Sequence, residues 1–227
     1  MKWLTNFLTS SIGQKLIMSL TGLFLVTFLI VHLAGNLQLM SNDGGVAFNQ
    51  YAYFMTSNPV IKFTSYGLYL FILLHAVQGI LIYFKNRSAK GSRYAVASTK
   101  TTTLPSRHMA LLGTLILAFL FIHMGDFWLK MKMGSLSTVE YAGYDAPIND
   151  LYSRVATAFK NPLIVVAYVI GQIVLGMHLW HGFQSSFQTL GLNHKKYTPA
   201  IHSLGKIFSI VVPIGYAIIP LYHYFLA

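Results

Sequence analysis

The sequence has no cysteine among its 227 residues. This absence excludes disulfides, thiolate zinc sites and iron–sulfur clusters held by this chain. Charge is also scarce, because only 9% of the residues are Asp, Glu, Lys or Arg, against about 25% in a typical soluble domain. Hydrophobic residues make up 55% of the chain and the mean hydropathy is +0.56. This composition indicates a membrane protein.

Acidic residues are rarer still, five against 16 Lys and Arg, which gives a net charge of +11. A strongly basic chain can bind nucleic acid. Here the basic residues lie between apolar runs, so we expect no nucleic-acid partner. The first apolar run lacks a small-residue cleavage site and is interpreted as a true span, not a signal peptide.

Five apolar runs are long enough to cross a bilayer, which takes about 20 residues. They cover residues 16–39, 60–84, 108–129, 163–187 and 207–226. The sequence therefore predicts an all-α membrane protein, a bundle of five transmembrane helices in a single domain over residues 1–227. The polar linkers 41–59 and 131–161 are expected to carry short helices along the membrane surface.

Basic residues are divided unevenly between the two sides that five spans define. Eleven of the 16 fall in the N-terminal tail and in the 85–107 and 191–206 linkers: Lys2, Lys15, Lys85, Arg87, Lys90, Arg93, Lys100, Arg107, Lys195, Lys196 and Lys206. All five acids fall on the other side or at its edge. Because cytoplasmic loops carry the excess of Lys and Arg, we expect a cytoplasmic N-terminus and an external C-terminus.

Histidines occur inside four of the spans, where an ionisable side chain is costly and usually functional. At a rise of about 1.5 Å per residue, His32 and His123 lie roughly 22–24 Å from the cytoplasmic edge. His75 and His178 lie about 13 Å from it. The four histidines therefore form two pairs at two depths. A single such histidine can equally be a hydrogen-bonded packing residue.

Matching spacings suggest an internal duplication of a two-helix unit, 1–86 and 107–187, with a fifth helix added. Pro59 precedes His75 by 16 residues, as Pro162 precedes His178. Each of these histidines begins an H-x-x-x-G motif. Gly22 and Gly113 each precede the histidine of their own span, His32 or His123, by ten residues.

Two facing imidazoles without carboxylates or thiolates suit the axial positions of haem iron, because the porphyrin supplies the other four nitrogens. Bis-histidine iron has no open position for a substrate, so two haems at two depths indicate an electron path across the membrane. Small residues would open room for the macrocycle, or equally allow close helix packing. The candidates are Gly22, Gly35, Gly79, Gly113, Gly125 and Gly182.

His181 is a second candidate on the fourth span, three residues after His178 and on nearly the same helix face. The repeated spacing favours His178 as the ligand. His181 would then contact a haem propionate or a quinone, or would only pack.

The motifs around these histidines resemble one known family. They are SLTGLFL at 19–25, LHAVQG at 74–79, FIH at 121–123 and HLWHG at 178–182. Over essentially its whole length the chain resembles the cytochrome b subunit of the single-anchor, two-haem succinate dehydrogenases and fumarate reductases, particularly the form in Bacteroidetes-like bacteria.

This resemblance implies two haems b, with His75 and His178 on the iron of the proximal haem and His32 and His123 on that of the distal haem. It implies a flavoprotein that holds FAD and an iron–sulfur subunit as partners, menaquinone as substrate, and the bacterial inner membrane as location. It also suggests Ser19 near a haem propionate, although a serine often bonds back to its own helix. A membrane-embedded glutamate of some relatives has no equivalent in residues 163–187.

A quinone site is expected near Asp126 and Trp128, just beyond His123. Two alternatives are that Asp126 orients the ligand histidine and that Trp128 belongs to the interfacial aromatic belt. The succinate dehydrogenase active site itself is not expected in this chain. The alternative functions are the cytochrome b of another dehydrogenase or a hydrogenase, a haem-free proton-coupled transporter, and a purely structural anchor.

Overall fold

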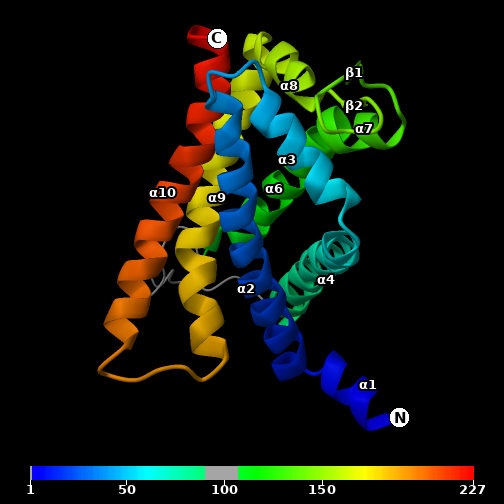
Figure 1. Cartoon of the computed structure of the whole chain (residues 1–227). Helices are drawn as coiled ribbons and strands as arrows, with labels where there is room; N and C mark the ends of the chain where they lie inside the picture. Colours follow the sequence, from blue (N-terminus) through cyan, green and yellow to red (C-terminus); the bar gives the residue numbers. More distant parts are fainter. Residues whose placement is uncertain (1, 90–106) are drawn as a thin grey trace.

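A computed structural model describes residues 2–89 and 107–227 and shows an all-α membrane bundle (Figure 1). Five helical segments are long and apolar enough to cross a membrane. They are α2 (Ser11–Asn36) with the 3-10 turn η1 (Leu37–Met40), α4 (Pro59–Ala89), α6 (Met109–His123) with η2 (Met124–Leu129) and α7 (Lys130–Lys132), α9 (Pro162–Thr189), and α10 (Thr198–Phe225). The prediction of five spans in a multi-pass membrane protein is confirmed.

Helix boundaries differ from the prediction mainly at the fifth span. We expected it to begin at residue 207, but α10 begins at Thr198. Pro199 fits the first turn of a helix because its missing N–H is not needed there. The first span also begins earlier than residue 16, because the Ser10 hydroxyl caps α2 by accepting a hydrogen bond from the Gly13 amide at 3.0 Å.

Short elements occupy the linkers at the end of the bundle that carries the C-terminus. They are α3 (Val46–Ser57), α8 (Leu151–Phe159) and the antiparallel pair β1 (Thr138–Val139) and β2 (Ile148–Asn149). The expected short helices in both linkers are confirmed, whereas the strands were not predicted. A further helix, α1 (Lys2–Thr9), precedes the first span.

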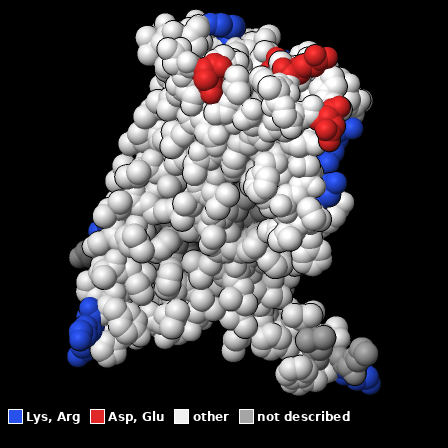
Figure 2. Space-filling model, viewed as in Figure 1, with Lys and Arg blue, Asp and Glu red and all other residues white. Residues whose placement is uncertain are grey.

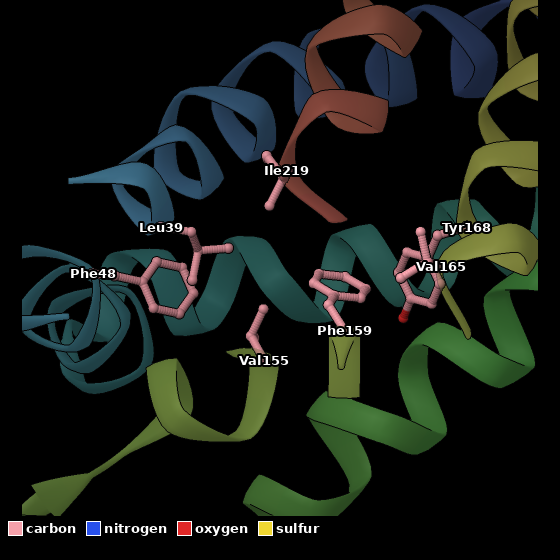
Figure 3. Packing of buried hydrophobic residues seen from close by; sticks show 7 residues of the cluster. All are labelled: Leu39, Phe48, Val155, Phe159, Val165, Tyr168 and Ile219. Atoms are coloured by element: carbon pink, nitrogen blue, oxygen red, sulfur yellow. The ribbon is translucent and has the colours of Figure 1, made fainter. Parts of the chain in front are cut away.

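The apolar core gathers at this same end, where η1, α3, α8, α9 and α10 meet (Figure 3). Its members are Leu39, Phe48, Val155, Phe159, Val165, Tyr168 and Ile219. Asn49, only 1% exposed, joins the segments by donating to Tyr141 Oη at 3.1 Å and Asp150 Oδ1 at 2.9 Å while accepting from the Tyr152 amide. We call α3, β1, β2 and α8 together the outer cap.

The spanning helices show many large apolar side chains on their outer faces, as a lipid-exposed bundle requires. α10 packs along α9, and α2 packs against both α4 and α9. The two termini lie at opposite ends of the bundle, as an odd number of crossings demands (Figure 1).

In Figure 2 the acidic side chains on the visible face gather at the end that carries the C-terminus. The cytoplasmic location of the N-terminus stays a prediction. Three of the eleven basic residues on which it rests, Lys90, Arg93 and Lys100, lie outside the described residues.

Candidate functional site

The four histidines within the spans come together as two facing pairs. The rings of His75 on α4 and His178 on α9 have their centroids 6.2 Å apart. Those of His32 on α2 and His123 at the end of α6 are 5.7 Å apart. Each pair therefore joins two helices that are distant in the sequence, in the combination that the depths had suggested.

These separations fit a shared iron atom. A bond from a metal to an imidazole nitrogen is about 2 Å, so two such bonds in line place the ring centroids about 6 Å apart. Within residues 2–89 and 107–227, no group of three or more His, Cys, Asp or Glu could hold a bare metal ion. A pair of histidines is sufficient only for a metal that brings its other ligands, as haem does.

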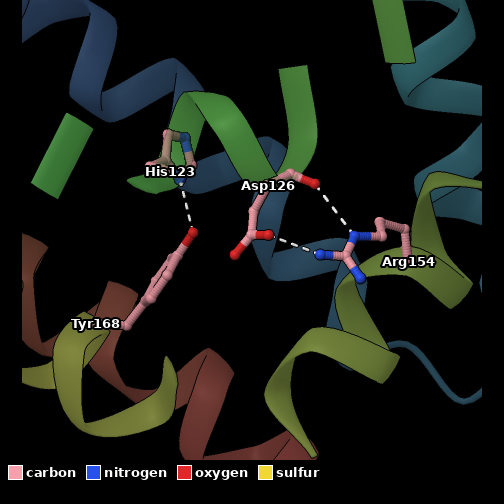
Figure 4. Close-up of polar contacts among 4 residues, drawn as sticks. All are labelled: His123, Asp126, Arg154 and Tyr168. Atoms are coloured by element: carbon pink, nitrogen blue, oxygen red, sulfur yellow. Dashed lines mark hydrogen bonds and ion pairs between the residues drawn. The ribbon is translucent and has the colours of Figure 1, made fainter. Parts of the chain in front are cut away.

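Hydroxyl groups lie at the second ring nitrogen of one histidine in each pair. Thr21 Oγ1 lies 3.2 Å from His75 Nδ1, and its own proton is donated to the Ile17 carbonyl at 2.7 Å. Tyr168 Oη lies 3.4 Å from His123 Nδ1 (Figure 4). A ligand histidine usually donates its free N–H to such an oxygen, which fixes the tautomer and the orientation of the ring. Both contacts suit histidines that bind through Nε2.

The other two histidines differ. His32 has the Asn36 amide nitrogen within 3.3 Å of Nδ1, although that amide also donates to the His32 carbonyl at 2.6 Å. Nδ1 of His178 is buried without a hydrogen-bond partner among the described residues. A buried polar atom left unpaired is costly. Its presence here is more easily understood at a functional site than in ordinary packing.

Glycines lie directly beside the inner pair, as we call His75 and His178. A Cβ added at Gly22 would be 3.2 Å from His75 Cε1, and one at Gly113 would be 4.0 Å from His178 Cε1. At Gly125 and Gly182 an added Cβ would meet nothing within 4 Å. Gly22 and Gly113 therefore let their helices approach the inner pair closely, whereas Gly125 and Gly182 border open space.

The remaining two predicted glycines serve helix packing instead. A Cβ at Gly35 would meet the Tyr51 ring, and one at Gly79 would lie 3.1 Å from the Met18 methyl group. Neither position adjoins a histidine ring.

Aromatic rings surround the outer pair, His32 and His123. His32 stacks with Phe28 at 5.0 Å, and His123 stacks with Phe119 at 5.8 Å. Tyr216 of α10 also lies 5.8 Å from the His32 ring. The two pairs therefore have different surroundings: small and hydroxyl-bearing residues at the inner pair, and an aromatic cage at the outer one.

An ion pair lies one helical turn beyond His123. Arg154 of α8 donates from Nη2 to Asp126 Oδ1 at 2.7 Å and from Nε to the Asp126 carbonyl at 3.1 Å (Figure 4). Asp126 lies in η2, a π-helical turn, and such turns are frequent at functional sites. Both side chains are 20% exposed, so the pair is largely removed from solvent.

The remaining residues predicted to lie near the site are Trp128, Ser19 and His181. Trp128 Nε1 donates to Tyr69 Oη at 2.8 Å and joins η2 to α4. Ser19 donates to the Lys15 carbonyl at 2.9 Å, which is the back-bond weighed as one alternative. The ring that faces His75 belongs to His178 and not to His181.

Sequence reasoning missed Thr21, Tyr168 and Arg154 as neighbours of the site. Thr21 adjoins Gly22 within a quoted motif, so its position was available, but nothing in the spacing indicated which histidine it would meet. Tyr168 reaches His123 from α9, and Arg154 reaches Asp126 from the outer cap. Only tertiary packing reveals those contacts.

The fold and the site thus define a multi-pass helical membrane protein with two facing histidine pairs inside its bundle. Comparison with protein-family models, with curated proteins and with solved structures finds no match. The chemistry of the histidine pairs is therefore the basis for a functional proposal.

Proposed function

We propose that the chain is a dihaem cytochrome b, with His75 and His178 as axial ligands of one haem and His32 and His123 as those of the other. The observation that carries this proposal is the pair of ring separations, 6.2 and 5.7 Å, on two helix pairs. When bound, haem supplies a one-electron couple. The four histidines would hold the two haems, and Thr21 and Tyr168 would orient the rings of His75 and His123.

Two bis-histidine haems have no open coordination position, which favours electron transfer over catalysis on the iron. We propose the role that the sequence resemblance suggests, the membrane subunit of a succinate:quinone oxidoreductase in a bacterial inner membrane. The chain would anchor a flavoprotein and an iron–sulfur subunit, which bind FAD and the clusters, and pass electrons between them and menaquinone. In this way it would join the tricarboxylic acid cycle to the respiratory chain.

For the quinone we propose the region of η2, beside the outer pair. Asp126 keeps one carboxylate oxygen turned away from Arg154 (Figure 4), and that oxygen would be available to hydrogen-bond a quinone. Trp128 provides an aromatic surface on the same turn. Because His123 lies one helical turn away, a quinone bound in this region would be close to the outer haem.

The decisive experiment is a dithionite-reduced minus oxidised spectrum of the chain purified with its native partners, together with a pyridine haemochrome assay. We expect two haems b per chain and no spectral shift with carbon monoxide, because both axial positions are filled. Absence of haem would overturn the proposal and favour a proton-coupled transporter or a bare anchor.

A second measurement separates the two kinds of cytochrome b. Co-purification with a flavoprotein whose activity is succinate oxidation or fumarate reduction supports the proposed complex. Co-purification with a hydrogenase or another dehydrogenase keeps the haem assignment and rejects the succinate assignment.

A further inference from the structure

A groove runs between α9 and α10. Its volume is about 510 Å³, within the range of about 300–1,000 Å³ typical of ligand sites. On α9 it extends from Val169 to Trp180, roughly 16 Å along the helix axis. The groove is therefore long enough to hold part of an extended acyl chain.

The floor of the groove is set by small residues and by proline. A Cβ at Gly176 would lie 2.9 Å from the Ser209 carbonyl oxygen, so glycine allows the two backbones to approach closely. Pro213 lacks the N–H that would otherwise bond that carbonyl. The walls are apolar, with Ile173 and Ile214 both more than half exposed. In a bilayer these walls face lipid.

One end of the groove carries a cation. Lys206 of α10 is exposed, and its Nζ lies 5.8 Å above the centre of the Trp180 ring. The loop between α9 and α10 adds Lys195 and Lys196, both exposed. No acidic residue occurs anywhere between Asp150 and the C-terminus, so nothing nearby in the sequence neutralises this end.

We propose that this groove binds an anionic phospholipid, with an acyl chain along α9 and α10 and the phosphate at Lys206 beside Trp180. The apolar walls match the acyl chain of such a lipid, and the exposed Lys206 beside Trp180 at one end matches its phosphate. The site is independent of the haems and of the proposed function. Basic pockets between spanning helices are known to select anionic headgroups.

A rival occupant is a quinol, because Gln172 also lines the groove. It is 6% exposed, and its buried Oε1 has no hydrogen-bond partner among the described residues. Gln172 lies about 12 Å along α9 from Trp180, too deep for a phospholipid headgroup held at Lys206. The charge at the end of the groove favours the phospholipid. Substitution of Lys206 should impair binding of a phospholipid, whereas substitution of Gln172 should impair binding of a quinol.

The test uses the full chain with its native partners in nanodiscs that contain equal amounts of phosphatidylglycerol and phosphatidylcholine. Lipids that stay bound after transfer to mild detergent are identified by native mass spectrometry. We expect phosphatidylglycerol to be retained selectively. Lys206→Ala should lower its retention about fivefold, Lys206→Arg should restore it, and Ala217→Phe, which fills the groove, should abolish it.

The matched control is Lys196→Ala, which removes a charge from the same edge but not from the groove and should retain the lipid. Each variant is first checked for an unchanged elution profile and thermal transition. Equal retention of both lipids, or no effect of Lys206→Ala, would overturn the proposal. Loss of a co-purifying quinone in Gln172→Leu, with Lys206→Ala silent, would assign the groove to the quinol instead.

Discussion

The α2–α4 and α6–α9 halves of the bundle place equivalent glycines against the two histidines of the inner pair. Gly22 adjoins His75, and Gly113 adjoins His178. The residue before each glycine differs, however, because Thr21 corresponds to Leu112. Thr21 provides an oxygen for His75 Nδ1, whereas Leu112 is a buried leucine with none to offer. The Nδ1 of His178 has no hydrogen-bond partner among the described residues, in keeping with the lack of a hydroxyl at position 112.

The comparison suggests that spacing and polar surroundings are set separately. Repeated spacing brings the histidines together and leaves room beside them. The groups that would tune each haem are not repeated: Thr21 at the inner pair, and Tyr168, Asn36 and the Asp126–Arg154 ion pair at the outer one. Since such partners adjust the basicity of a ligand histidine, we expect two haems of unequal potential.

The largest effect should come from removing a ligand. His178→Ala should lower the haem content from two to one per chain, because iron loses one of its two protein ligands. His181→Ala, three residues away on the same helix, should keep both haems. Haemochrome assays on the two purified variants provide the measurement. If His181→Ala lost a haem and His178→Ala did not, the assignment of the inner pair would be wrong.

Exchanging the residues that differ between the halves should have the next largest effect. Thr21→Val keeps the shape of the side chain but removes the oxygen at His75, so it should weaken haem retention by about tenfold or more. It should also raise the midpoint potential of that haem, since a less basic imidazole stabilises ferric iron less.

The reciprocal change, Leu112→Thr, would give His178 an acceptor and should lower the same potential. Redox titration of the visible bands distinguishes the two directions. A control at the outer face, Thr114→Val, alters a hydroxyl that donates only to its own helix, to the Ala110 carbonyl, and should change neither quantity. Shifts of the same sign in Thr21→Val and Leu112→Thr would contradict the proposed equivalence of the two halves.

Removing the ion pair between Arg154 and Asp126 tests whether it acts on the outer histidine pair alone. Arg154→Gln leaves the Asp126 carboxylate without its cation and should destabilise the outer end of the bundle by roughly 1–3 kcal/mol, between the values for exposed and buried pairs. Spectral changes should be confined to one of the two haems. Thermal unfolding followed at the haem bands measures both effects. Equal perturbation of the two haems would show that the ion pair is not specific to His123.

Hydropathy was sufficient to predict the five spans, because the bilayer requires each to be long, apolar and helical. The pairing of His32 with His123 and of His75 with His178 followed from the regular rise of those helices. The hydrogen bonds of Tyr168 and Arg154 could not be predicted in this way. Both depend on how α9 and the outer cap fold back onto η2, which no local pattern in the sequence specifies.

Hydropathy did not predict the beginning of α10 correctly. Residues 198–206 include His202, Ser203 and Lys206, so they lack the apolar character used to recognise a span. They are nevertheless helical from Thr198 onward. Backbone hydrogen bonding favours helix at the membrane edge even where side chains are polar, so composition placed the boundary too late.

The smallest expected effect concerns the outer cap, which has no described counterpart at the inner pair. Burial raises the pKa of the Asp150 carboxyl, but hydrogen bonds from Ser153 and Asn49 lower it by more, so the pKa lies below its ordinary value. A carboxyl with a depressed pKa stabilises the folded cap above its unfolded pKa. That contribution is lost as the pH falls through the folded pKa.

Asp150 is also the N-cap of α8, where its Oδ1 accepts a hydrogen bond from the Ser153 amide at 3.1 Å. Asp150→Ala should therefore destabilise the outer cap by about 1 kcal/mol, the usual value for a lost N-cap, and should flatten the response of the outer cap to acid. Hydrogen exchange of residues 138–159 measured across the acidic range would follow both changes. Asp145→Ala removes an exposed carboxylate from the same loop and is the matched control. If the acid response of the cap persisted in Asp150→Ala, another group would control it, and the ion pair at Asp126 would be the next to test, because Arg154 joins the cap to the turn beyond His123.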